Sequence, residues 1–217
     1  MGMSSLVLTA DTLLGTPTVG SLEYDGKAFY GTPIGTQRGV VPNAQFYRLD
    51  SAYAGANATG AQGVFGVGTG GTGIGVTLSA STVYAFEAIY AGFKTAGITA
   101  HSIGFGFGGA ATLNNIAYLG YGNNTTGAFP ARVTTTISQS YVNTATNTQF
   151  IDSTSTAAVC FYARISGTVS VNAGGTFIPQ YTLSAAPGGA YTIAAGSYFL
   201  IYPIGASGAN TSVGTWA

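Results

Sequence analysis

The sequence has very little charge. Only twelve of its 217 side chains are ionised, six acidic and six basic, so 6% of residues are charged, whereas an ordinary soluble domain carries about 25%. A compact protein of this size exposes roughly 9,000 Å² to solvent, which leaves about 750 Å² of surface for each charge. The formal net charge is zero, and this favours self-association. We therefore expect neighbouring molecules, rather than water, to cover much of this surface.

Other scarcities exclude further classes of protein. Six Lys and Arg residues scattered along the chain cannot form the basic stripe that a nucleic-acid partner requires. The single cysteine, Cys160, excludes an intrachain disulfide and a thiolate metal cluster. No run of 18 apolar residues occurs, so we expect no membrane-spanning helix and no membrane partner. The composition, 46% hydrophobic and 12% aromatic, excludes intrinsic disorder.

Residues that support catalysis are also few. The only histidine, His101, has no acidic neighbour in the sequence, and we interpret it as a histidine at a strand end, bonded to backbone or water. Glycosidases need two nearby carboxyl groups, but Asp50, Glu87 and Asp152 are far apart along the chain. Metal sites need clustered His, Cys, Asp or Glu, and the sequence has no such cluster. We predict that the protein is not an enzyme and has no cofactor.

The charges divide the chain into two parts. Residues 1–50 hold seven of the twelve and the other 167 residues hold five, which suggests an N-terminal arm over residues 1–42 and a larger head over residues 43–217. Within the arm, Asp25-Gly26 lies between two alternating runs and predicts a two-residue type I′ turn in a β-hairpin. That turn would place Leu22 opposite Phe29 and Tyr24 opposite Lys27. The following residues 31–42 are rich in Gly and Pro and indicate a connector.

The head is predicted to consist of strands. No 12-residue segment has helical periodicity with good helix formers, whereas alternation with period two is frequent. The clearest strands are expected over residues 83–90, 103–108, 159–165 and 197–202, and weaker ones near 44–52, 115–121, 131–141, 148–152, 168–173 and 177–184. About eight to ten strands of this spacing suit one antiparallel domain of two sheets.

The segment of residues 103–108 alternates Ile and Phe with Gly104, Gly106 and Gly108. Glycine in a strand packs nothing and costs entropy, so three glycines on one face indicate that another group comes close. That group is either part of the same chain, at a crowded point, or part of another subunit. The sequence leaves both alternatives open.

Two segments resemble a known class of protein. Residues 8–30, LTADTLLGTPTVGSLEYDGKAFY, resemble a segment of tailed-bacteriophage structural proteins that joins a stalk to a terminal β domain. Residues 174–204, from GGTFIPQY to GSYFLIYPI, resemble the closing strands of that domain, which is similar in kind to the trimeric jelly rolls of tumour-necrosis-factor and complement globular heads. The resemblance implies an all-β fold, an antiparallel two-sheet jelly-roll sandwich with an N-terminal β-hairpin arm.

The resemblance implies a virion protein without catalytic residues. Because the arm begins close to Met1 with no fibrous stalk before it, we expect a homotrimeric capsid cement or decoration protein, made in the host cytoplasm, with the major capsid protein or other virion proteins as partners. The alternative is the receptor-binding head of a tail fibre, with a host surface glycan as partner. Partner or capsid contacts are expected at Leu6, Val7, Leu8, Leu22, Tyr24, Phe29 and Tyr30, and trimer contacts at Phe105, Phe107, Tyr198 and Tyr202.

Overall fold

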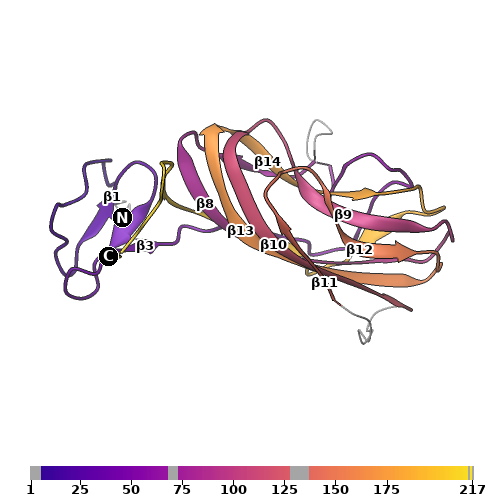
Figure 1. Cartoon of the computed structure of the whole chain (residues 1–217). Helices are drawn as coiled ribbons and strands as arrows, with labels where there is room; N and C mark the ends of the chain where they lie inside the picture. Colours follow the sequence, from indigo (N-terminus) through magenta and orange to yellow (C-terminus); the bar gives the residue numbers. More distant parts are fainter. Residues whose placement is uncertain (1–5, 68–72, 128–136, 215, 217) are drawn as a thin grey trace, which may run out of the picture.

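The chain folds into a small N-terminal arm and a larger head, joined end to end (Figure 1). The computed structural model describes residues 6–67, 73–127, 137–214 and 216, and within them it contains strands and no helix. Consequently no apolar helix that could cross a membrane occurs in this part of the chain. The predicted all-β class with antiparallel sheets in a sandwich is confirmed.

Two antiparallel sheets face each other in the head. The larger sheet has the order β11-β10-β13-β8; both β16 and β15 then pair with β8, and β4 and β5 lie beyond them. Its strands are β4 (Gln45–Arg48), β5 (Tyr53–Ala54), β8 (Thr82–Lys94), β10 (Thr112–Thr126), β11 (Ser138–Val142), β13 (Val159–Ala173), β15 (Tyr191–Ile193) and β16 (Tyr198–Ala206).

The smaller sheet has the order β12-β9-β14, and β6 and β7 both pair with β14. Its strands are β6 (Gln62–Gly63), β7 (Val76–Leu78), β9 (His101–Gly108), β12 (Thr148–Thr154) and β14 (Gly175–Leu183). Every strongly predicted strand is present, and β8, β10 and β13 are longer than predicted. The segments expected at 159–165 and 168–173 are one continuous strand, β13. Of the segment expected at 131–141, residues 131–136 lie outside the described residues.

The core between the two sheets is made largely of aromatic rings. Phe107 stacks on Phe177 with ring centroids 4.4 Å apart, and it meets Phe86 at 5.1 Å and Tyr118 at 5.6 Å. These residues alternate along their strands with residues that face outward, so period two directs one face of each strand to the core. Aromatic pairs of this kind stabilise a core beyond the burial of their apolar area.

The structure shows which group comes close to the glycines of β9, a point that the sequence left open. A Cβ atom at Gly106 would lie 2.7 Å from the carbonyl oxygen of Ala145, and one at Gly104 would lie 3.1 Å from that of Thr148. The close neighbour is therefore part of the same chain. Phe105 and Phe107 are 0% and 6% exposed in the core, so the prediction that they form trimer contacts is wrong.

The arm is more elaborate than a hairpin. Its sheet has three strands, β1 (Leu22–Tyr24), β2 (Phe29–Gly31) and β3 (Gly39–Val41), and β3 lies in the segment expected to be a connector. The hairpin is present with a different register: Tyr24 pairs with Phe29 and Leu22 with Gly31. The predicted two-residue turn is wrong, because four residues, 25–28, separate the two strands.

Side-chain hydrogen bonds explain the wider turn. The Asp25 carboxylate accepts bonds from the backbone amides of Lys27 and Ala28, at 2.7 and 2.8 Å, and Gly26 has a positive φ of 84°. A carboxylate that caps two amides favours this longer loop over a tight type I′ turn. The C-terminal residues beyond β16 return to the arm, where Asn210 and Val213 line a hollow with Tyr30. In space the head therefore ends near residue 206.

Candidate docking surfaces

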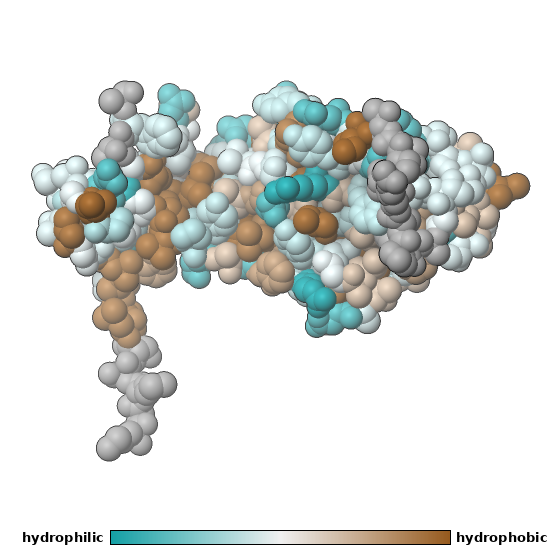
Figure 2. Space-filling view, turned by 90° about the horizontal axis from the view of Figure 1, so that it is seen from below, coloured by the Kyte–Doolittle hydropathy of each residue, from teal (hydrophilic) through white to brown (hydrophobic). Residues whose placement is uncertain are grey.

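The arm exposes many large apolar side chains for its size. Figure 2 shows brown residues gathered over the arm and its junction with the head. Trp216 and Leu6 are both 81% exposed and Val7 is 80% exposed. The other exposed apolar side chains of the arm are those of Leu14, Val19, Leu22, Ile34 and Val41. We call these eight residues the arm surface. Single exposed apolar side chains are ordinary on a protein surface, but a group of them on one small unit indicates a binding site.

The arm backbone is held by two carboxylates. Glu23 pairs with Arg38, with Oε2 and Nε 2.9 Å apart and both side chains largely buried, and it accepts the backbone amide of Leu14 at 2.7 Å. Asp25 accepts the hydroxyl of Tyr30 at 2.9 Å in addition to its two amides. The Lys27 ammonium donates to the carbonyl of Ala80 in the head. The arm is therefore a folded unit bonded to the head, which can present the arm surface in a fixed orientation.

The predicted arm contacts divide into three groups. Leu6, Val7 and Leu22 are exposed, and Leu8 is half-buried. Tyr24 and Phe29 stack on each other with centroids 4.7 Å apart and keep part of their surface free.

Tyr30, the last predicted arm contact, is only 4% exposed. Its hydroxyl donates to Asp25, and a Cβ atom at Gly205 of β16 would lie 3.1 Å from its oxygen. The prediction that Tyr30 contacts a partner is wrong, because its ring packs where the arm meets the head. Burial together with hydrogen bonding raises the pKa of its phenol well above its ordinary value.

A second candidate surface is the face of the larger sheet that points away from the core. Residues paired across neighbouring strands share a face, so the strand registers define two adjacent rows on it. The first row is Phe46, Leu200, Glu87, Ser166, Leu119 and Tyr141, and the second is Arg48, Tyr198, Ile89, Arg164, Tyr121 and Gln139. We call these twelve residues the outer face. Its apolar members include Tyr141 at 73% and Phe46 at 58% exposure.

The charges at the centre of the outer face neutralise each other. Arg164 Nη2 lies 3.0 Å from Glu87 Oε2, and the hydroxyl of Tyr198 donates to Glu87 Oε1 at 2.6 Å. The bond from Tyr198, followed by the bond from Arg164, lowers the pKa of the Glu87 carboxyl. Glu87 therefore stays ionised and paired with Arg164 near neutral pH, and the centre of the face has no net charge that would repel an identical face.

Two predicted trimer contacts, Tyr198 and Tyr202, are half-buried on the side of β16 that faces away from the core. Ile89 and Tyr121 belong to the same exposed surface but were not among the predicted contacts. The alternation of the sequence contains this information in part, because Ile89 lies on the opposite side of its strand from Tyr90. Tertiary pairing determines which strands lie beside the strand of Ile89, and local alternation does not reveal that pairing.

Among the residues that the structure describes, the remaining titratable groups do not assemble into a reactive site. His101 bonds the carbonyl of Thr99 at 2.7 Å and the hydroxyl of Tyr191 at 2.6 Å, and its burial lowers its pKa. Lys94 is 1% exposed, and its Nζ has no hydrogen-bond partner among the residues described. Of the three acids of the head, Glu87 pairs with Arg164 and Asp50 with Arg48, and Asp152 bonds Gln149 at 3.2 Å.

The acidic residues, the histidine and the lone thiol form no metal site in the described part of the chain. The described residues contain no group of three or more His, Cys, Asp or Glu that could hold a metal ion. Cys160 is buried in β13, as expected for a small hydrophobic residue in a sheet, and its thiol donates to the carbonyl of Gly127 at 3.0 Å. The comparisons add no identity: no protein-family model, curated protein or solved structure matches this chain.

Proposed function

We propose that this chain is a non-enzymatic structural protein of a tailed-bacteriophage virion, a capsid cement protein that forms a homotrimer. The observation that carries the proposal is the concentration of exposed apolar side chains on two surfaces of a protein with almost no charge. The chain exposes 11149 Å² as a single molecule, more than the roughly 9,000 Å² expected for its mass. A large surface with few charges and many exposed apolar side chains favours association with other molecules over a monomer in water.

The proposal assigns different tasks to the two surfaces. The outer face joins heads around a three-fold axis, because it is broad, aromatic and internally neutral, as subunit contacts are. The arm surface docks on the capsid lattice, because it lies at the far end of the molecule from most of the head. Apolar burial contributes about 25 cal/mol per Å², and repetition over many copies multiplies the attachment.

The strand order supports a jelly roll. With the β10–β11 pair set aside, each sheet has four positions, and most connections cross from one sheet to the other. Eight-stranded jelly rolls also place four strands in each of two sheets, and this likeness supports the proposed fold. In the proposed fold, β10 and β11 extend the larger sheet and widen the outer face by Leu119, Tyr121 and Tyr141.

The direct test is removal of the arm. We expect a chain lacking residues 1–42 to keep its folded head and to assemble through the outer face, but to lose attachment to particles from which the protein has been stripped. The matched variant Ile98→Asp changes an exposed loop residue of the head and should bind as the full chain does. Unchanged attachment of the truncated head would place the docking surface elsewhere and contradict the proposal.

The second candidate function is the tip of a receptor-binding fibre. The exposed rings of Tyr121 and Tyr141 favour it, because aromatic faces with a polar hydroxyl suit sugar binding. Glycan arrays and antibody labelling of particles distinguish the two functions. Labelling over the whole capsid supports a cement protein, whereas labelling restricted to the tail together with glycan binding supports the fibre tip.

A further inference from the structure

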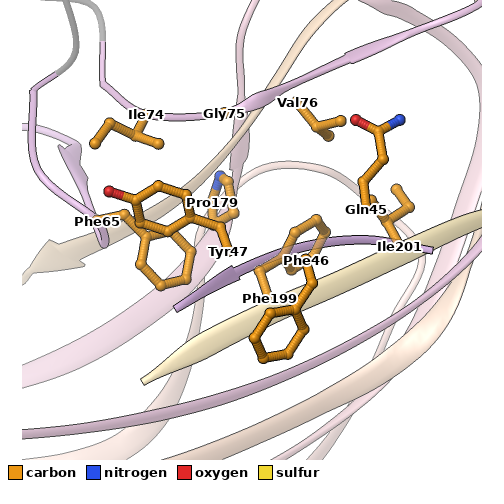
Figure 3. A pocket seen from close by; sticks show the side chains of 10 residues that line it. All are labelled: Gln45, Phe46, Tyr47, Phe65, Ile74, Gly75, Val76, Pro179, Phe199 and Ile201. Carbon is orange, nitrogen blue, oxygen red and sulfur yellow. The ribbon is translucent and has the colours of Figure 1, made fainter. Parts of the chain in front are cut away.

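An apolar cavity opens at one side of the head, between the two sheets. Figure 3 shows its lining: Phe199, Ile201 and Tyr47 belong to the larger sheet, and Ile74 and Val76 approach from β7 and the residues before it. Its volume is about 160 Å³, close to that of protein cavities that accept a benzene-sized apolar group. The cavity is therefore large enough for an aliphatic side chain.

The strand at the mouth of this cavity has a free edge. β4 pairs with β16 on one side, and no strand of the described residues pairs with its other side. Leu49 donates its amide to Ser197 and accepts the amide of Gly196, so its backbone groups face β16. Backbone direction alternates along a strand, and the amides and carbonyls of Phe46 and Arg48 therefore face the open edge. An added strand would find both donors and acceptors there.

The chain also contains a short apolar segment without a strand partner. Residues 6–8 are Leu-Val-Leu, they lie outside every strand, and Leu6 and Val7 are about four-fifths exposed. β-branched and aliphatic residues of this kind suit a strand. In an extended conformation Leu6 and Leu8 share one face and Val7 has the other.

We propose that residues 6–8 of a second copy of this chain add as a strand to the free edge of β4 and insert Leu6 into the cavity, with Leu8 lying at its rim. The inference rests on the self-assembly of the proposed function and names one of its contacts. It assigns Leu6 and Val7 of the arm surface to a second copy, and the other six residues of that surface remain for the capsid. With Val7 opposite Phe46, the backbone of Val7 bonds the free groups of β4. Leu6 and Leu8 then lie beside Gln45 and Tyr47, the residues of β4 that share the inward face with Ile201 and Phe199.

This strand pairing would explain both the uncovered edge of β4 and the exposed apolar side chains of residues 6–8. An edge strand with exposed aromatic residues invites uncontrolled pairing unless something covers it, and β4 carries Phe46 and Tyr47 at 58% and 41% exposure. The segment of residues 6–8 likewise exposes its apolar side chains to water. Exchange between copies covers both, and it links subunits through the arm as well as through the outer face.

Chemical cross-linking between copies tests the proposal. Chains with Val7→Cys and chains with Arg48→Cys, distinguished by tags, are co-expressed and treated with a short bis-maleimide; the native Cys160 is buried. The diagonal position of Arg48 relative to Val7 brings the two thiols within reach. We expect a covalent heterodimer as the main product. A link formed only within one chain, in the doubly substituted variant Val7→Cys/Arg48→Cys, would overturn exchange between copies.

Two further variants test insertion into the cavity. In the chain that carries Val7→Cys, Leu6→Asp would bury a carboxylate in apolar surroundings and should lower the heterodimer yield at least about tenfold. Its matched control is Thr9→Asp, an exposed position on the same side of the segment as Val7, which should leave the yield unchanged. Neither variant removes a core contact. Equal losses for the two variants would overturn insertion into the cavity.

The size of the assembly, measured by sedimentation of the same samples, separates this inference from the proposed function. Trimers that give no heterodimer would overturn the strand exchange and leave the cement protein in place. Monomers throughout would overturn the proposed self-assembly, and the exchange with it. Trimers together with the heterodimer support both.

Discussion

The arm and the head are stabilised in different ways. In the head, rings from both sheets pack in a core around Phe107, and hydrogen bonds of the strand ladders connect almost every segment. In the arm, the strands have three residues each. The carboxylates of Asp25 and Glu23 accept backbone amides of the turn and of Leu14 within the same arm. A short sheet cannot bury enough apolar area alone. As a result, the arm leaves the apolar side chains of the arm surface exposed to solvent, whereas the head buries most of its own.

The largest effect is expected from the aromatic core. Phe107→Ala removes a ring that stacks on Phe177 and should lower the free energy of unfolding of the head by about 3–5 kcal/mol. Chemical denaturation measures this change. Ile98→Ala, at a position 72% exposed, serves as the control and should stay within about 0.5 kcal/mol of the parent. Equal small losses would mean that the head is not held by this cluster.

The crowded strand β9 should give the next effect. Gly106→Ala places a methyl group 2.7 Å from the carbonyl oxygen of Ala145, and overpacking of this kind costs about 1–3 kcal/mol. Gly15→Ala in the arm meets no atom within 4 Å and should be neutral. Thermal unfolding of both variants compares a tightly packed region with an open one. A neutral Gly106→Ala would show that the loop at Ala145 moves away without cost.

A smaller and more local effect is expected in the arm. Asp25→Ala leaves the amides of Lys27 and Ala28 and the hydroxyl of Tyr30 without their acceptor. Because the turn is only part-buried, water replaces some of these bonds, and we expect a total loss of about 1 kcal/mol. Faster hydrogen exchange in the arm, with an unchanged unfolding transition of the head, would show it. Asp11→Ala, at an exposed site, is the matched control. An equal loss of stability in the head would contradict this expectation and show that the turn at Asp25 also stabilises the head.

The smallest effect is expected from pH. Burial lowers the pKa of His101 in the folded chain below its ordinary value, which is about 6.5 in an unfolded chain. The unfolded state therefore binds more protons in this range, and the free energy of unfolding falls as the pH falls through about 6.5. His101→Gln should flatten this dependence between pH 5 and 7. An unchanged slope in the variant would assign the dependence to other groups.

The sequence predicted the strands of the head well because their alternation is local. Residues such as Tyr84, Phe86 and Tyr90 show which side of β8 faces the core before any partner strand is known. The turn at Asp25 was mispredicted because a side-chain hydrogen bond competes with the backbone preference of Asp-Gly. The burial of Phe105 and the neutral pair of Glu87 with Arg164 depend on contacts between strands distant in the sequence, which local patterns do not specify.

We propose that other copies of this chain cover part of its apolar surface. Sedimentation velocity of the full chain, followed to high dilution, measures whether it assembles. We expect a species of three chains, each of 21.8 kDa, that persists at submicromolar concentration. A single species with the mass of one chain at every concentration would contradict the claim.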